Sequence, residues 1–272
     1  EAEGRSVMTY AAELIRDSRK IVVKIGSNTL STEKGQVNYK RLHNLVEQLV
    51  SFMDQGKQIL IVTSGAGVCG TAAINKWKRK SDMNYKQALC AIGQVELMMA
   101  YKELFKEHGR HVGQMLLCND DFGNQSRNLH IRNTLFTLVD EGVVPIINEN
   151  DSVTVDEIKI GDNDTLSALT ASLWGADLLI ILSDIDGVYD KNPKEYPDAE
   201  LIEVIRDIDR ATETIQIGKS NDFGTGGIAT KLSAARIVNK VGIPMAIMNG
   251  FKEDILEAVL DGKEKATVFL PE

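Results

Sequence analysis

The segment DLLIILSDIDG, residues 177–187, places a continuous apolar run directly before a polar tail that ends in glycine. A short run without polar alternation is typical of a strand that helices cover on both faces, as in parallel sheets. Comparable runs recur at residues 21–25, 58–63, 112–118, 143–148 and 243–248. We therefore expect a buried strand at each of these places.

Helical periodicity fills the stretches between these runs. Apolar residues recur at three- and four-residue spacing over residues 39–54, 86–107, 127–141, 165–173 and 228–241. Because parallel strands need crossover connections, the alternation predicts an α/β fold, a three-layer αβα sandwich with a mostly parallel central sheet. Residues 152–155 and 157–160 instead alternate apolar and polar side chains, which predicts a small hairpin at a solvent edge.

The chain shows no Gly/Ser-rich or Pro-rich linker that would divide it. We expect a single domain over residues 8–272, with a soft internal boundary just before residue 177. In an open parallel sheet, ligands bind beyond the carboxyl ends of the strands. The functional residues should therefore lie in the segments that directly follow the predicted strands.

Composition narrows the class of protein. The net charge of −8 disfavours broad binding to nucleic acid or anionic membranes, because clustered Lys and Arg hold phosphate groups. No apolar run approaches the ~20 residues that a membrane-spanning helix needs. Cys69, Cys90 and Cys118 form no CxxC pair, which indicates reduced thiols and a cytoplasmic location. The four histidines favour surface or capping roles, and we assign no metal ligands.

Two familiar phosphate-binding motifs fail on inspection. Gly65-x-Gly67-x-x-Gly70 follows a predicted strand, but the acidic residue that a dinucleotide site needs at the end of the next strand is missing. The nearest candidate, Asp82, lies in a polar stretch. Gly218-Lys219-Ser220 resembles the end of a P-loop, yet Glu213 occupies the position of the required first glycine.

A stronger phosphate candidate is FGTGGIATK, residues 223–231, which runs into a predicted helix. Glycines let backbone N–H groups approach an anion closely, and a helix N-terminus adds a favourable dipole. Lys231 would then face the phosphates. The alternative is a glycine-rich surface loop with a solvated lysine.

A second polar cluster, GDND at residues 161–164, opens another predicted helix and could be only a turn with an N-cap. What favours function is the combination: Lys24, Asp151, Asp164, Asp184 and Lys231 all fall at element ends expected on one edge of the sheet. Phosphoryl transfer needs mainly positioning and electrostatic stabilisation, which two lysines and an orienting carboxylate supply.

Together these segments resemble the glutamate 5-kinase family of the amino acid kinase superfamily. The matching segments are VVKIGS at 22–27, VTSGA at 62–66, NEND at 148–151, GDND at 161–164, SDIDGVY at 183–189 and GTGGIATK at 224–231. They span nearly the whole chain in the order found in that family, and their combination is far more specific than any one of them.

The resemblance implies ATP-dependent phosphorylation of the side-chain carboxylate of L-glutamate, the first step towards proline. The implied catalytic residues are Lys24, Asp164 and Lys231. The implied substrate-binding residues are Ser64, Gly65, Ala66, Asn148, Asp151 and Asn163. The implied nucleotide-binding residues are Lys24, Gly26, Ser183, Asp184, Lys219, Thr225, Gly226, Gly227, Ile228, Ala229, Thr230 and Lys231.

The resemblance also implies Mg²⁺ with the ATP, feedback inhibition by L-proline and a homo-oligomer, with no nucleic-acid or membrane partner. Two departures stand out. Gly67 replaces a residue that is more often larger in the family, which loosens the expected substrate loop. The chain stops at Glu272, so we expect neither the C-terminal RNA-binding-like domain of many bacterial members nor the fused reductase domain of some eukaryotic ones.

Two alternatives stay open at this point. The chain could be another superfamily member, such as an acetylglutamate, aspartate, uridylate or carbamate kinase, although the NEND and GDND segments favour glutamate 5-kinase. It could instead be a non-catalytic amino-acid-binding regulator. Retention of both Lys24 and Lys231 weighs against a regulator, because pure binding needs no charge that stabilises a transition state.

Overall fold

The computed structural model describes residues 9–75, 82–154, 163–193, 195–214 and 227–271. Within them, an eight-stranded sheet has the strand order β3-β4-β2-β1-β5-β7-β8-β6. The strands are β1 (Lys20–Ile25), β2 (Gln58–Val62), β3 (His111–Leu117), β4 (Val143–Glu149), β5 (Leu178–Ser183), β6 (Val204–Ile205), β7 (Met245–Asn249) and β8 (Thr267–Phe269). Neighbouring strands pair in parallel except β7 and β8, which pair antiparallel. The predicted α/β class and mostly parallel sheet are confirmed.

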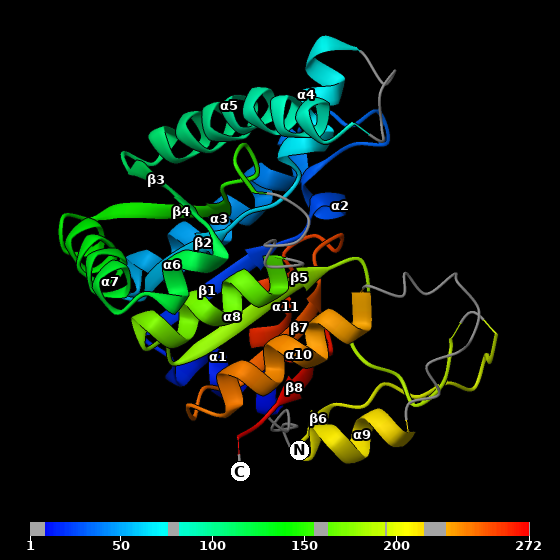
Figure 1. Ribbon diagram of the computed structural model, residues 1–272. Coiled ribbons are helices and arrows are strands. Elements are labelled where there is room, and N and C mark those ends of the chain that lie inside the picture. Colours follow the sequence, from blue (N-terminus) through cyan, green and yellow to red (C-terminus); the bar gives the residue numbers. More distant parts are fainter. Residues whose placement is uncertain (1–8, 76–81, 155–162, 194, 215–226, 272) are drawn as a thin grey trace.

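Helices cover both faces of this sheet (Figure 1). The helices are α1 (Tyr10–Asp17), α2 (Ser27–Leu30), α3 (Tyr39–Asp54), α4 (Ala66–Ile74), α5 (Met83–Glu107), α6 (Asn119–Gly123), α7 (Gln125–Asp140), α8 (Asn163–Trp174), α9 (Ile208–Thr214), α10 (Gly227–Asn239) and α11 (Ile255–Leu260). One layer contains α7, α8 and α10, and the other contains α1, α3 and α11, with α5 packed beside α3 and the edge strand β3. None of the helices in the described ranges is long and apolar enough to cross a membrane.

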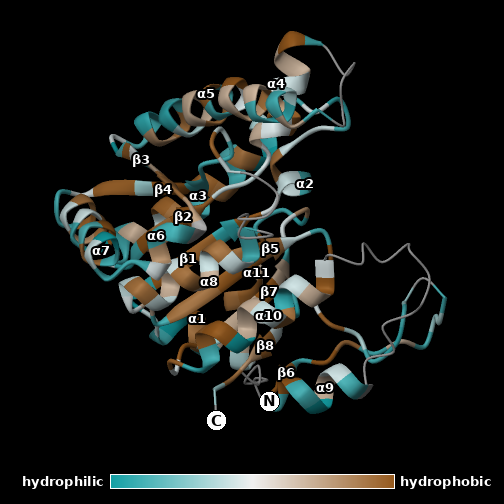
Figure 2. Cartoon of the chain, in the orientation of Figure 1, coloured by the Kyte–Doolittle hydropathy of each residue, from teal (hydrophilic) through white to brown (hydrophobic). Residues whose placement is uncertain are grey.

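The strands are apolar on both faces because each face packs against its own hydrophobic cluster. In β1, Ile21, Val23 and Ile25 enter the cluster that includes α1, α3 and α11, whereas Val22 enters the cluster that includes α7, α8 and α10. Successive side chains of a strand point to opposite faces, so an unbroken apolar run is what two covered faces require. Figure 2 shows the resulting hydrophobic strands in the centre of the molecule.

The predicted strands and helices are present, with ends that shift by a few residues. The elements that the sequence did not predict have nine residues or fewer, α4 and α1 being the longest of them. For example, β6 and β8 have only two and three residues and are stabilised by pairing with each other. The expected hairpin falls mostly on residues 155–162, which lie outside the described residues. Residues 152 and 153 belong to a turn after β4.

The strand order brings the ends of distant segments to one edge of the sheet. β1 lies between β2 and β5, and β2 also pairs with β4. The carboxyl ends of these four strands therefore lie side by side, and α2 and α4 begin directly after β1 and β2. This is the edge where ligands bind in open α/β sheets.

Candidate active site

A buried carboxylate joins two ammonium groups at this edge. Oδ1 of Asp164 lies 2.8 Å from Nζ of Lys24, and Oδ2 lies 3.1 Å from Nζ of Lys231. Asp164 is fully buried and the lysine side chains are only 7% exposed. The hydroxyl of Thr230 donates a further hydrogen bond of 2.9 Å to Oδ2. The structure thus brings together the three residues that the sequence nominated for catalysis.

Three separate elements supply this charge triad of Lys24, Asp164 and Lys231. Lys24 lies near the end of β1, Asp164 in the first turn of α8, and Lys231 in the second turn of α10. Burial opposes ionisation of Asp164, but the charges and hydrogen bonds of the two lysines outweigh it and lower the pKa of the carboxyl. With two ammonium groups against one carboxylate, the triad keeps an excess positive charge that suits a phosphoryl group.

A cavity of about 590 Å³ lies beside the triad. Its walls come from the end of β1, helix α2, the end of β5 with the segment after it, and the start of α10. The predicted nucleotide residues that line it are Lys24, Gly26, Ser183, Asp184, Gly227, Ile228 and Lys231. Among the described residues, no atom lies within 4 Å of a Cβ added to Gly227, so this position leaves open space beside the cavity.

Two aspartates on this cavity wall are held by hydrogen bonds. Asp184 accepts from the Asn28 amide at 3.0 Å and from the Ser183 hydroxyl at 3.2 Å. Burial disfavours the charged form of Asp184, yet these donors lower the pKa of its carboxyl. Asp186 accepts from Asn249, Tyr189 and Lys252, and its pKa is lowered in the same way. Both carboxylates are therefore ionised at neutral pH.

The amide of Asn163 connects the strand ends on the other side of the triad. Its Nδ2 donates to the Thr63 carbonyl at 2.6 Å, to Asn148 Oδ1 at 2.8 Å and to the Ser64 hydroxyl at 3.1 Å. Gly65 begins α4 with a φ of +90°, a conformation that favours glycine. Residues from β2, β4 and α8 that are far apart in sequence thus meet beside Asp164.

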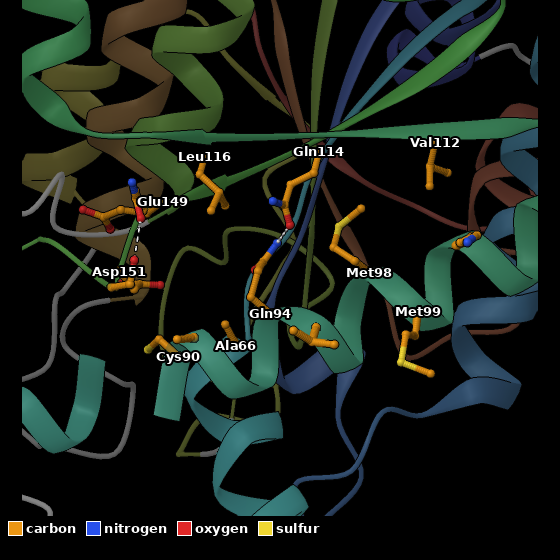
Figure 3. Close-up of a pocket in the computed structure, with 15 residues that line it drawn as sticks. Ala66, Cys90, Gln94, Met98, Met99, Val112, Gln114, Leu116, Glu149 and Asp151 are labelled. Atoms are coloured by element: carbon orange, nitrogen blue, oxygen red, sulfur yellow. Dashed lines mark hydrogen bonds between the residues drawn. The ribbon is translucent and has the colours of Figure 1, made fainter. Parts of the chain in front are cut away.

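A second cavity of about 570 Å³ opens next to this amide cluster. Ala66 and Asp151 line it together with residues of α5 and β3, as Figure 3 shows. Among the predicted substrate residues, these two line the cavity, while Ser64 and Asn148 are buried and do not line it. After the roles that the sequence predicts for their residues, we call this region the acceptor side and the 590 Å³ cavity the nucleotide side.

Several predicted nucleotide residues do not line the cavity or cannot be located in it. Lys219, Thr225 and Gly226 lie outside the described residues, as do Gly161 and Asp162 of the GDND segment. Ala229 is exposed, and Thr230 contacts Asp164 instead of the cavity wall. The described part of the predicted nucleotide site therefore comprises Lys24, Gly26, Ser183, Asp184, Gly227, Ile228 and Lys231.

The structure adds residues to the site that were not predicted from the sequence. Asn28 and Asp186 flank residues that were nominated, and their position after a strand could have identified them. Gln94, Gln114 and Lys252 contact site residues from a helix interior, an edge strand and a distant loop. No local pattern distinguishes these three from other polar residues.

Comparison with known proteins agrees with this geometry. A model of the amino acid kinase family matches residues 19–249. The protein named glutamate 5-kinase from Alkaliphilus metalliredigens is 61% identical over 257 residues, which cover 94% of this chain and 97% of that protein. The glutamate 5-kinase from Alkaliphilus oremlandii is 58% identical over 260 residues, which cover 96% of this chain and 99% of that protein.

Solved structures share the fold at low sequence identity. The UMP kinase from Ureaplasma parvum has a TM-score of 0.66 at 18% identity and covers 93% of this chain and 98% of its own. An isopentenyl phosphate kinase has a TM-score of 0.63 at 16% identity, with 92% and 99% covered. From the family match and the close relatives, the chain belongs to the amino acid kinase family and, within it, to the glutamate 5-kinases.

Proposed function

We propose that this protein transfers the γ-phosphoryl group of ATP to the side-chain carboxylate of L-glutamate and so forms L-glutamyl 5-phosphate, the first step of proline biosynthesis. The observation that carries the proposal is the buried triad, in which Asp164 holds Lys24 and Lys231 next to the 590 Å³ cavity. The family membership and the 58–61% identity to glutamate 5-kinases support the choice of acceptor.

The two lysines stabilise the transferring group. In phosphoryl transfer, negative charge spreads over the equatorial oxygens while the attacking and leaving oxygens stay in line. Ammonium groups that are fixed before the reaction stabilise this charge without further reorganisation. Asp164 orients both ammonium groups and does not act as a base, because both of its oxygens contact lysines and its pKa is lowered.

The acceptor side binds glutamate. Ser64, Asn148 and Asn163 supply polar groups beside the triad, and the carboxylate of Asp151 suits the α-ammonium group of an amino acid. The backbone of Gly65 and Ala66 at the start of α4 suits a carboxylate. Asn163 directly precedes Asp164 in the first turn of α8. This turn therefore places the bound glutamate next to Lys24 and Lys231.

The nucleotide side binds ATP with Mg²⁺. Mg²⁺ usually keeps several waters and takes one or two carboxylates plus substrate phosphates, and Asp184 on the cavity wall fits that requirement. When bound, the cation offsets phosphate charge. Gly26, Gly227 and Ile228 line the space for the nucleotide, and Ser183 helps to hold Asp184 in place.

Three further features belong to the proposal: feedback inhibition by L-proline and a homo-oligomer, both on family resemblance alone, and a cytoplasmic location, which the pattern of cysteines also favours. Proline kinetics test the first of these. Activity that stays unchanged in millimolar proline would rule out this form of regulation.

The reaction is tested by measuring ADP release with MgATP and a panel of L-glutamate, N-acetylglutamate, aspartate, UMP and carbamate. Hydroxylamine is included to trap an acyl phosphate as its hydroxamate. We expect glutamate-dependent turnover with hydroxamate formation. Turnover with another acceptor alone would contradict the assigned substrate, and no turnover with any acceptor would favour a non-catalytic regulator.

A further inference from the structure

Four side-chain amides form a continuous chain from the triad to the edge of the sheet. Asn163 donates to Asn148, Nδ2 of Asn148 donates to Oε1 of Gln94 at 2.8 Å, and Nε2 of Gln94 donates to Oε1 of Gln114 at 3.0 Å. Figure 3 shows the side chains of Gln94 on α5 and Gln114 on β3 pointing toward one another beside the 570 Å³ cavity. Gln94 is thus the link between Asn148 and the sheet edge.

Two backbone groups fix the direction of this chain. The N–H of Glu149 can only donate, and it donates to Oδ1 of Asn148 at 2.9 Å. The carbonyl of Thr63 can only accept, so the atom of Asn163 that contacts it must be Nδ2. Asn148 therefore turns Nδ2 toward Gln94, which must present its oxygen in return. A reversed carboxamide at Gln94 would bring two donors together.

The helix turn that carries Gln94 also contacts the other wall of the acceptor side. A Cβ on Gly93 would lie 1.7 Å from the carbonyl oxygen of Ala66 and 2.4 Å from the backbone nitrogen of Gly70. Gly70 in turn leaves no room for a Cβ against Leu89 of α5. This close backbone packing fixes the position of α5, and hence of Gln94, relative to the loop at Ser64–Ala66.

The nucleotide side has no such connection to this helix. The described residues that line the 590 Å³ cavity come from β1, α2, β5, the segment after β5, α10 and β7, and none comes from α5 or β3. A change at Gln94 should therefore alter binding of the acceptor and leave binding of ATP intact.

We infer that Gln94 is a positioning residue of the acceptor side, which holds the Asn148 carboxamide in the orientation needed to bind the amino-acid substrate. This inference rests on the proposed role of Asn148 in binding glutamate. Gln94 and Asn148 are both buried, so the hydrogen bond between them has little competition from water. Without an acceptor at position 94, Nδ2 of Asn148 would lose its hydrogen bond to Gln94, and only the contacts of Oδ1 with Glu149 and Asn163 would hold the carboxamide.

The test is the variant Gln94→Met, which keeps the volume and removes both hydrogen-bonding groups. We expect the KM for glutamate to rise about tenfold, since removing one partner of a buried hydrogen bond has an effect of this order. The KM for ATP should stay within about twofold. Gln48→Met is the matched control, because Gln48 is also buried, accepts a hydrogen bond from the backbone N–H of Leu256 and lines neither cavity. It should lower Tm without changing either KM.

A double-variant cycle with Asn148→Ala separates positioning from general damage. If Gln94 acts through Asn148, Gln94→Met should add almost nothing to the KM for glutamate in the Asn148→Ala background. An undiminished effect there, or equal rises in both KM values, would overturn the inference. Asn148→Ala with an unchanged KM for glutamate would instead refute the proposed acceptor side itself.

A milder variant keeps the inference testable if Gln94→Met does not fold. Gln114→Met removes only the outer hydrogen bond of Gln94, from an exposed position on β3. We expect a rise of about twofold to threefold in the KM for glutamate alone, because this bond is more accessible to water. An unchanged KM for glutamate in this folded variant would count against the amide chain.

Discussion

The two sides of the candidate site use different chemistry. On the nucleotide side, ionised groups dominate: Lys24, Lys231, Asp184 and Asp186 line one cavity. On the acceptor side, neutral amides and backbone groups around Asn163 make the connections. This division fits the proposed function, in which charge stabilises the phosphate groups on one side and directed hydrogen bonds select the amino acid on the other. The difference means that variants on the two sides should affect different kinetic constants.

The largest effect is expected from Asp164→Asn, which removes the negative charge that Lys24 and Lys231 share. Removing one member of a buried ion pair or triad leaves the remaining charges without a counter-charge and lowers the free energy of unfolding by about 3–5 kcal/mol. Denaturant unfolding measures this loss, and kcat should fall as well. Asp209→Asn, which breaks only an exposed ion pair with Arg236, is the matched control and should change stability by less than about 1 kcal/mol.

Lys231→Ala should lower kcat by about 10²-fold or more with a modest change in the KM for glutamate, because the ammonium acts mainly in the transition state. Lys240 is an exposed lysine just after the same helix and serves as the control. Steady-state kinetics of Lys231→Ala and Lys240→Ala test this prediction, with the loss of kcat expected only in Lys231→Ala. An equal kcat in Lys231→Ala and wild type would remove Lys231 from the mechanism.

Asn163→Ala and Asn28→Ala test the division between the sides directly. The first loses hydrogen bonds to Thr63, Ser64 and Asn148, and we expect the KM for glutamate to rise about tenfold. The second releases Asp184, and the KM for ATP should rise a few-fold instead. If each variant raised both constants equally, the proposed division would be wrong.

The smallest effect is confined to acid pH. The folded-state pKa of Asp164 is lowered, so its contribution to stability is present above its unfolded pKa, about 3.9, and is lost as pH falls through the folded value. The difference in unfolding free energy between wild type and Asp164→Asn should thus stay constant above about pH 5 and shrink below about pH 4. If the difference in unfolding free energy between wild type and Asp164→Asn grew as pH fell, the pKa of Asp164 would be raised in the folded state and not lowered.

Much of the fold could be predicted from local patterns, because buried strands and amphipathic helices leave signals within a few residues. The runs at β1, β2, β4 and β5 identified the central strands and their polar ends. Short elements such as β6 left no such signal, since two residues acquire a strand conformation only by pairing with β8. The candidate residues Lys24, Asp164 and Lys231 were nominated from motifs, and their catalytic roles stay predictions.

The sequence by itself determined the class of sheet, the polar segments at the strand ends and the residue types that suit phosphoryl transfer, because hydrophobic periodicity and chemical type are local properties. Only the tertiary structure decided which groups meet. Asp164 contacts lysines far away in the chain on both sides, and Gln94 contacts Asn148 from the interior of a helix. Those contacts depend on strand order and helix packing, which bring together residues whose separation in sequence carries no sign of their proximity.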